Sequence, residues 1–100
     1  QIFLSLNNDI DSKENRGLNS SIKNYLKLLS FFDPDKIKIC LPVKNDFGDM
    51  DKEDYKCWTK KMEIISKKNQ KEDIRLMAQK IYTSGKLSKN LFKKTKLINE

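Results

Sequence analysis

Apolar residues recur at the spacing of an α-helix in three segments of this chain, and this pattern constrains the fold more than any other feature. In the first segment, Ile22, Tyr25, Leu26 and Leu29 follow the i, i+3, i+4, i+7 rule. Two later segments repeat similar spacing with Tyr55, Trp58, Met62, Ile65 and with Ile74, Met77, Ala78, Ile81. The spacing predicts helices near residues 20–32, 54–68 and 72–84, with a short further helix after Ser88.

Turn-forming residues set the expected boundaries of these helices. Asp33-Pro34 ends the first helix, and Gly85 is placed to end the third. Residues 7–17 and 44–51 are polar, and we expect both to be non-helical.

Two apolar segments allow more than one interpretation. Residues 1–6 alternate apolar side chains, which fits a short strand or a segment that packs back on the helices. Ile37, Cys40 and Leu41 fit one short helix that begins at Pro34 and stops at Pro42. The alternation of Ile37, Ile39 and Leu41 makes a strand the weaker option.

The length of 100 residues corresponds to one domain with one modest core. The predicted fold class is therefore all-α, a compact bundle of four to five short helices. The chain starts with Gln1 and not Met, so we expect a fragment of a larger protein or a processed form. The predicted core consists of Leu26, Leu29, Phe32, Trp58, Met62, Ile65, Ile74, Met77, Ala78 and Ile81.

The positive charge of the chain lies in its second half. Residues 1–50 contain seven Lys/Arg and seven Asp/Glu, whereas residues 51–100 contain 14 and 7, which gives the net charge of +7. This distribution favours binding of an acidic protein motif; a nucleic-acid-binding surface and a merely solvated lysine face are the alternatives. The predicted partner-binding residues are Lys60, Lys61, Lys67, Lys68, Lys71, Arg75 and the aromatic Tyr82.

The residue types speak against catalysis and metal binding. The chain has no His, which removes His-based acid–base chemistry, the Ser-His-Asp triad and His metal ligands. Asp46-Phe47-Gly48 spells a kinase triplet, but the chain is too short for that fold. The acidic residues from Asp49 onward do not form an EF-hand calcium loop. With Asp49 at the first position, Asp54 stands where the loop needs Gly and Lys60 where it needs Glu. We expect a non-enzymatic module without cofactor or metal.

The two cysteines and the hydropathy of the chain indicate in which cellular compartment we expect the protein. We expect Cys40 and Cys57 to be free thiols in an intracellular protein; a Cys40–Cys57 bridge in a small secreted helical factor is the alternative. No apolar run approaches the roughly 18–20 residues of a membrane span.

Four features follow one another between residues 62 and 81. They are the apolar pair Met62/Ile65, the basic turn Lys67-Lys68, the acidic cap Glu72-Asp73-Ile74 and the helix segment Ala78-Gln79-Lys80-Ile81. This order resembles the end of the N-terminal (LW) domain of transcription elongation factor TFIIS, and residues 22–29 are similar to its leading Leu-rich helix. The resemblance implies an all-α scaffold that binds short acidic motifs with aromatic anchors in transcription-associated proteins, and a nuclear location.

Overall fold

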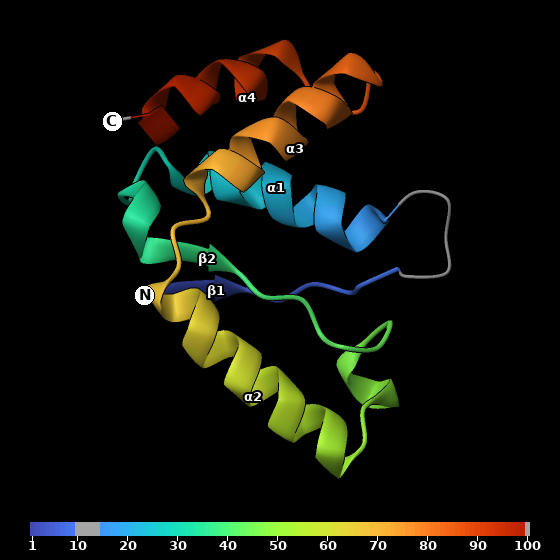
Figure 1. The fold of residues 1–100 in the computed structure, drawn as a ribbon. Coiled ribbons are helices and arrows are strands. Elements are labelled where there is room, and N and C mark those ends of the chain that lie inside the picture. Colours follow the sequence, from blue (N-terminus) through green and yellow to red (C-terminus); the bar gives the residue numbers. More distant parts are fainter. Residues whose placement is uncertain (10–14, 100) are drawn as a thin grey trace.

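The computed structural model describes residues 1–9 and 15–99, in which two short strands lie between helices on both sides (Figure 1). Helices α1, α3 and α4 cover one side of the strands, and α2 covers the other. The elements in chain order are β1 (Ile2–Leu4), α1 (Arg16–Leu28), β2 (Ile37–Ile39), α2 (Lys52–Lys67), α3 (Lys71–Thr83) and α4 (Lys89–Lys93). Three 3₁₀ segments complete the fold: Pro34–Lys36, Phe47–Asp49 and Lys94–Asn99.

Strands β1 and β2 pair in parallel, with Ile2 opposite Ile37 and Leu4 opposite Ile39. Because α1 connects them, the first 39 residues form a βαβ unit. The prediction of a mostly helical fold is confirmed, but the all-α class is wrong in this respect. The segment after Pro34 is a single 3₁₀ turn followed by a strand and not the short helix that we expected. The β-branched Ile37 and Ile39 suit a pleated strand, and pairing with β1 satisfies their segment's backbone.

Helix α1 begins four residues earlier than predicted. The side chain of Asn15 caps it, accepting a hydrogen bond from the Leu18 N–H at 3.0 Å. Gly17, expected in a loop, is therefore a buried helical residue. A Cβ at this position would lie 1.4 Å from the backbone oxygen of Asn7, so only glycine allows the chain after β1 to pass so close to the helix. Of the loop predicted at residues 7–17, residues 10–14 lie outside the described part of the chain.

The main core lies between the strands and the helices α1, α3 and the C-terminal segment. Of the predicted core, these residues are buried: Leu26, Leu29, Ile65, Ile74, Ala78 and Ile81. Trp58, Met62 and Met77 are half-buried. Phe32 is 42% exposed, so its assignment to the core was wrong. Helix α1 ends at Leu28, and the chain turns before Phe32 can continue the apolar face.

The two later helices match their predicted ranges closely. Asp51 caps α2, and Asp51 and Asp54 exchange hydrogen bonds with each other's backbone N–H in a capping box. Helix α3 is followed by Gly85 with φ of 79°, the left-handed conformation that glycine adopts easily. Ser88 caps α4, as expected. The predicted non-helical segment 44–51 holds one 3₁₀ turn, Phe47–Asp49.

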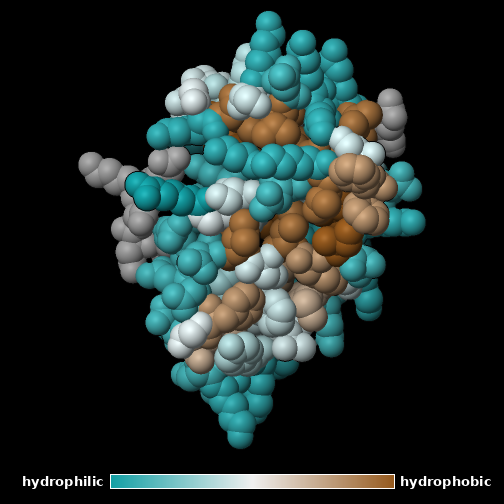
Figure 2. Space-filling model, turned by 180° about the vertical axis from the view of Figure 1, so that it is seen from behind, coloured by the Kyte–Doolittle hydropathy of each residue, from teal (hydrophilic) through white to brown (hydrophobic). Residues whose placement is uncertain are grey.

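The surface of this fold is unevenly hydrophobic. Seen from behind, hydrophobic residues form several patches between the hydrophilic upper and lower ends of the molecule, and a row of hydrophilic side chains separates the upper patch from those below it (Figure 2). None of the helices in the described part of the chain is both long and apolar enough to cross a bilayer. Cys40 and Cys57 are free thiols, the first buried and the second exposed. Burial raises the pKa of the Cys40 thiol, and the positive charge of Lys61 opposes this shift.

Candidate functional site

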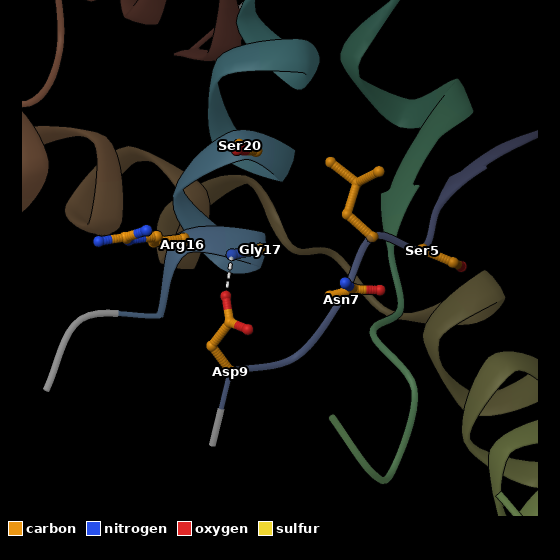
Figure 3. Close-up of a pocket in the computed structure, with 7 residues that line it drawn as sticks. Ser5, Asn7, Asp9, Arg16, Gly17 and Ser20 are labelled. Atoms are coloured by element: carbon orange, nitrogen blue, oxygen red, sulfur yellow. Dashed lines mark hydrogen bonds between the residues drawn. The ribbon is translucent and has the colours of Figure 1, made fainter. Parts of the chain in front are cut away.

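The chain that leaves β1 and the first turn of α1 line a shallow, open pocket (Figure 3). Its volume is about 390 Å³. It is lined by Ser5, Leu6, Asn7, Asp9, Arg16, Gly17 and Ser20. The pocket thus lies beyond the carboxyl end of a parallel strand and faces the start of a helix. In α/β folds, ligands bind at this edge of the sheet.

A hydrogen-bond network joins the end of β1 to the start of α1. Asp9 accepts a hydrogen bond from the Gly17 N–H at 3.0 Å, through one carboxylate oxygen. The backbone N–H of Asp9 donates to Asn15 at 3.1 Å, and the Asn15 amide donates to Asn8 at 2.6 Å. Asn15 therefore caps the helix and also holds the preceding chain. The Asp9 carboxylate sits where the helix dipole favours a negative charge.

A second pocket continues from the first along α1. Arg16 and Ser20 line both pockets, and the second adds Asn19, Lys23 and Lys86, with a volume of about 380 Å³. Arg16 and Lys23 are seven residues apart, so they project from the same side of α1. Lys86 follows the turn at Gly85 after α3, where its N–H donates to the Ile81 carbonyl at 2.9 Å, and it lines the same pocket.

We call the group of Arg16, Ser20, Lys23 and Lys86 the α1 basic pocket. Three cations, a hydroxyl and an adjacent amide are groups that bind phosphate oxygens. Asp9 supplies one carboxylate beside it, and Mg²⁺ in proteins is often held by one or two carboxylates together with phosphate oxygens of the ligand. Residues 1–9 and 15–99 contain no group of three or more His, Cys, Asp or Glu side chains placed to hold a metal ion by themselves.

The structure does not gather the seven predicted partner-binding residues into one face. Lys60, Lys61 and Lys67 lie on α2, and Lys68 follows it, whereas Lys71, Arg75 and Tyr82 lie on α3. These two helices lie on opposite sides of the strands (Figure 1). The excess positive charge of residues 51–100 is therefore distributed over several surfaces of the molecule.

The three predicted residues on α3 already have partners within the chain. Lys71 pairs with Asp35 at 2.9 Å, and this hydrogen bond and positive charge lower the pKa of the Asp35 carboxyl. Arg75 pairs with Glu72 one turn earlier on the same helix. Tyr82 is half-buried and stacks on Phe92, with ring centroids 4.1 Å apart. An external ligand would have to compete with these contacts.

Although α2 and α3 lie on opposite sides of the strands, both border a small apolar groove beside β2 and the linker that joins them, with a volume of about 210 Å³. It is lined by Asn8, Leu18, Ile39, Leu41, Lys61, Ile65, Gln70, Asp73, Ile74 and Met77. Lys61 is the member of the predicted set found in this lining. Asp73 adds a charge of the opposite sign, so the groove is less basic than the sequence led us to expect.

Sequence reasoning missed the α1 basic pocket. Its members lie in segments that differ little in composition from the rest of the chain, and Lys86 is 70 residues from Arg16. The available signal was the polar stretch between the alternating residues 1–6 and the first helix. That stretch indicates a ligand site only once Ile2–Leu4 are known to form a parallel strand, because the stretch then follows the carboxyl end of the strand.

No protein-family model, no curated protein sequence and no solved structure matches the chain. The resemblance to the TFIIS N-terminal domain therefore stays a prediction.

Proposed function

We propose that this chain binds nucleic acid and holds the sugar-phosphate backbone in the α1 basic pocket. The observation that carries the proposal is that Arg16, Lys23 and Lys86 line one pocket together with Ser20, and that this pocket adjoins the one at the carboxyl end of β1. Cations, hydroxyls and amides make most protein contacts to phosphates. The net charge of +7 supports attraction of a polyanion over longer distances.

The composition of the pocket favours a phosphodiester over an acidic peptide. Peptide partners of helical scaffolds are held mainly by apolar and aromatic anchors in an apolar core, with charges at the rim. The α1 basic pocket is lined by charged and polar residues. The pocket therefore favours nucleic acid, the alternative predicted from the sequence, over the acidic motif.

An acidic motif with an aromatic anchor remains a second candidate ligand, at a different place. The groove between α2 and α3 has an apolar lining and Lys61 at its side, and both features suit such a motif. The TFIIS resemblance supports the same candidate. Lys71 and Arg75, however, pair with Asp35 and Glu72 within the chain, so an acidic ligand at this groove would have to compete for them.

A titration separates the two candidates. Labelled generic DNA and RNA, single- and double-stranded, and an acidic-aromatic peptide are titrated at two salt concentrations, with and without Mg²⁺. The test variant carries Arg16→Ala, Lys23→Ala and Lys86→Ala. The matched control carries Lys52→Ala, Lys60→Ala and Lys67→Ala, which removes the same charge from exposed positions of α2.

We expect the wild-type chain to bind nucleic acid with strong salt dependence. Loss of three phosphate contacts reduces the slope of log K against log salt by up to about 2.7. The control variant is expected to change this slope much less. Equal losses in both variants would show attraction to overall charge and contradict the pocket. Binding of the peptide alone would favour the groove instead.

A further inference from the structure

The exposed face of α1 carries positive charge beyond the α1 basic pocket. Arg16, Ser20, Lys23 and Lys27 follow one another at helical spacing, so they lie in one row along the helix. We call these four residues the α1 basic row; Lys23 is half-buried and the other three are exposed. Helix α1 contains no Asp or Glu, so no acid on this helix offsets the charge of the row.

The C-terminal segment adds lysines beside both ends of this row. Residues 86–99 run in the same direction as α1 (Figure 1) and pack against it. Lys86 lines the same pocket as the start of the row, and the Lys94 ammonium donates a hydrogen bond to the Ser30 hydroxyl at 2.6 Å. Residues 86–99 contain five Lys and no Asp or Glu. The two neighbouring segments therefore offer an elongated positive surface, which attracts a linear polyanion.

An exposed aromatic ring lies at the far end of the row. Phe31 is 79% exposed, the highest fraction among the large hydrophobic residues of the described chain. The N–H groups of Leu29, Ser30 and Phe31 donate to carbonyls of the preceding turn, so the backbone continues its helical path as far as Phe31. Phe31 follows Lys27 by four residues and adjoins Ser30, to which Lys94 donates. An aromatic face thus ends the basic row.

The strands do not offer a competing surface for nucleic-acid bases. In some RNA-binding modules, bases stack on the open face of a sheet. Here helices cover both sides of the strands (Figure 1). At the edge of β2, the Ile39 N–H donates to the Gln70 side-chain oxygen at 2.9 Å, and the Gln70 amide donates to the Ile39 carbonyl at 2.9 Å. The exposed ring of Phe31 is therefore the better platform.

We propose that a single strand of nucleic acid lies along the α1 basic row and stacks one base on Phe31, an inference that rests on nucleic-acid binding in the α1 basic pocket. Proteins that bind single strands combine a positively charged surface for the backbone with aromatic rings for the bases. Helix α1 is about 20 Å long, which spans roughly six phosphates at the spacing of one stacked strand. In a duplex the base faces are already stacked on one another, so the ring of Phe31 favours a single strand.

The arrangement fits a linear polyanion better than an anionic membrane. A helix that lies on a membrane buries an apolar face beside its basic one. On α1 the cations extend over three turns, whereas the exposed Phe31 and Phe32 are confined to its end. Insertion of these two rings would also bring Asp33, the next residue, to the anionic headgroups.

The test compares labelled oligonucleotides of equal length by fluorescence anisotropy. They are a single strand without self-complementarity, the corresponding duplex, and an abasic strand that has the same phosphates and no bases. Phe31→Ala removes the ring, and Phe31→Tyr keeps an aromatic face. Ile64→Ala is the matched control, since Ile64 is also an exposed apolar residue but lies on α2. Vesicles of phosphatidylcholine and phosphatidylserine serve as a further probe.

We expect the wild-type chain to bind the single strand more tightly than the duplex or the abasic strand. Phe31→Ala should weaken binding of the single strand roughly fivefold or more, the value of one stacked base, and leave binding of the abasic strand unchanged. Phe31→Tyr and Ile64→Ala should bind like the wild type.

Equal affinities for the single and abasic strands, or tighter binding of the duplex, would overturn this inference. The proposed function would survive that result if the variant of Arg16, Lys23 and Lys86 still lost binding. Absence of all nucleic-acid binding would overturn both. Vesicle binding that depends on Phe31, without binding of the single strand, would also overturn both and would identify a membrane as the partner.

Discussion

Helices α1 and α2 flank the same two strands, but they are stabilised in different ways. Helix α1 has 13 residues, of which five are buried: Gly17, Ser21, Ile22, Tyr25 and Leu26. Helix α2 has 16 described residues, of which one, Ile65, is buried. The main core cluster of the described residues includes side chains from α1 and α3 and none from α2. Covering a sheet on both faces therefore does not stabilise both layers equally.

Helix α2 relies on local interactions instead. The Asp51/Asp54 capping box orders its first turn, and Phe47 packs edge-on against Trp58 with ring centroids 5.1 Å apart. The Trp58 indole also donates to the Cys40 carbonyl at 3.3 Å, which connects the helix to the end of β2. Few buried apolar contacts and many local ones are typical of a segment that opens before the rest of a protein. We therefore expect the strands and α1 to form the more stable unit.

Truncation in the core of α1 is expected to give the largest effect. Leu26 is fully buried, so Leu26→Ala should lower the free energy of unfolding by about 2–5 kcal/mol. The matched variant on α2 is Met62→Ala, at a half-buried position, for which we expect about 1 kcal/mol. Urea denaturation measures both. Equal losses would break the comparison between the two helices.

Gly17→Ala is expected to give the next largest effect. The new Cβ would overlap the Asn7 backbone oxygen, so the chain after β1 must move away from α1. Such overpacking costs typically about 1–3 kcal/mol, and we expect the upper end because the contact is with backbone. Gly48→Ala is the control, since its Cβ would meet only a side-chain oxygen of Asp46 at 3.1 Å. A Gly17→Ala protein as stable as the control would contradict this account of the close approach.

Removal of the α2 cap is expected to have a smaller effect, confined to that helix. Asp51→Ala removes the capping box and should cost about 1 kcal/mol. We expect faster amide hydrogen exchange in the first turns of α2 and unchanged exchange in α1. Hydrogen exchange followed by NMR would detect this difference. Uniform acceleration in both helices would instead show that the chain opens as one unit.

Tyr25 gives the smallest effect near neutral pH and a distinct effect at high pH. Burial, together with the nearby charge of Asp35, raises the pKa of Tyr25 to about 12 from 10.0. The unfolded chain therefore releases this proton first, and stability should be lost as pH rises from about 10 to 12. Tyr25→Phe removes this dependence and should cost at most about 1 kcal/mol at pH 7, through its hydrogen bond to Pro34. Urea denaturation at several pH values tests this; identical slopes in both proteins would contradict it.

Periodicity predicted α2 and α3 well because each helix carries its apolar stripe over three or more turns between clear end signals. The strands have a weaker sequence signal, since each has three residues and forms only by pairing with a segment 35 positions away. The start of α1 was predicted near residue 20, whereas Asn15 makes the cap and the helix begins at Arg16. That choice depends on Asp9 and Asn8, which bind Asn15 from the end of β1.

The candidate site was less predictable than the fold. The net charge is the sum of the charged residues, so the composition alone predicts a positively charged surface. The grouping of Arg16, Lys23 and Lys86 depends on a βαβ connection and on the turn at Gly85. Conversely, Lys71 and Arg75 follow helical spacing but are committed to Asp35 and Glu72. Helical spacing predicts the side of the helix from which a side chain projects, but its contacts depend on how the helix packs in the fold.

The two hydrogen bonds between Gln70 and Ile39 have a mechanical consequence. Together with the hydrogen bond from Lys38 to the Lys68 carbonyl, they hold the short linker between α2 and α3 against β2. Movement of this linker along the strand would break these hydrogen bonds together. One glutamine side chain therefore fixes the register between the strand and the connection of the two helices.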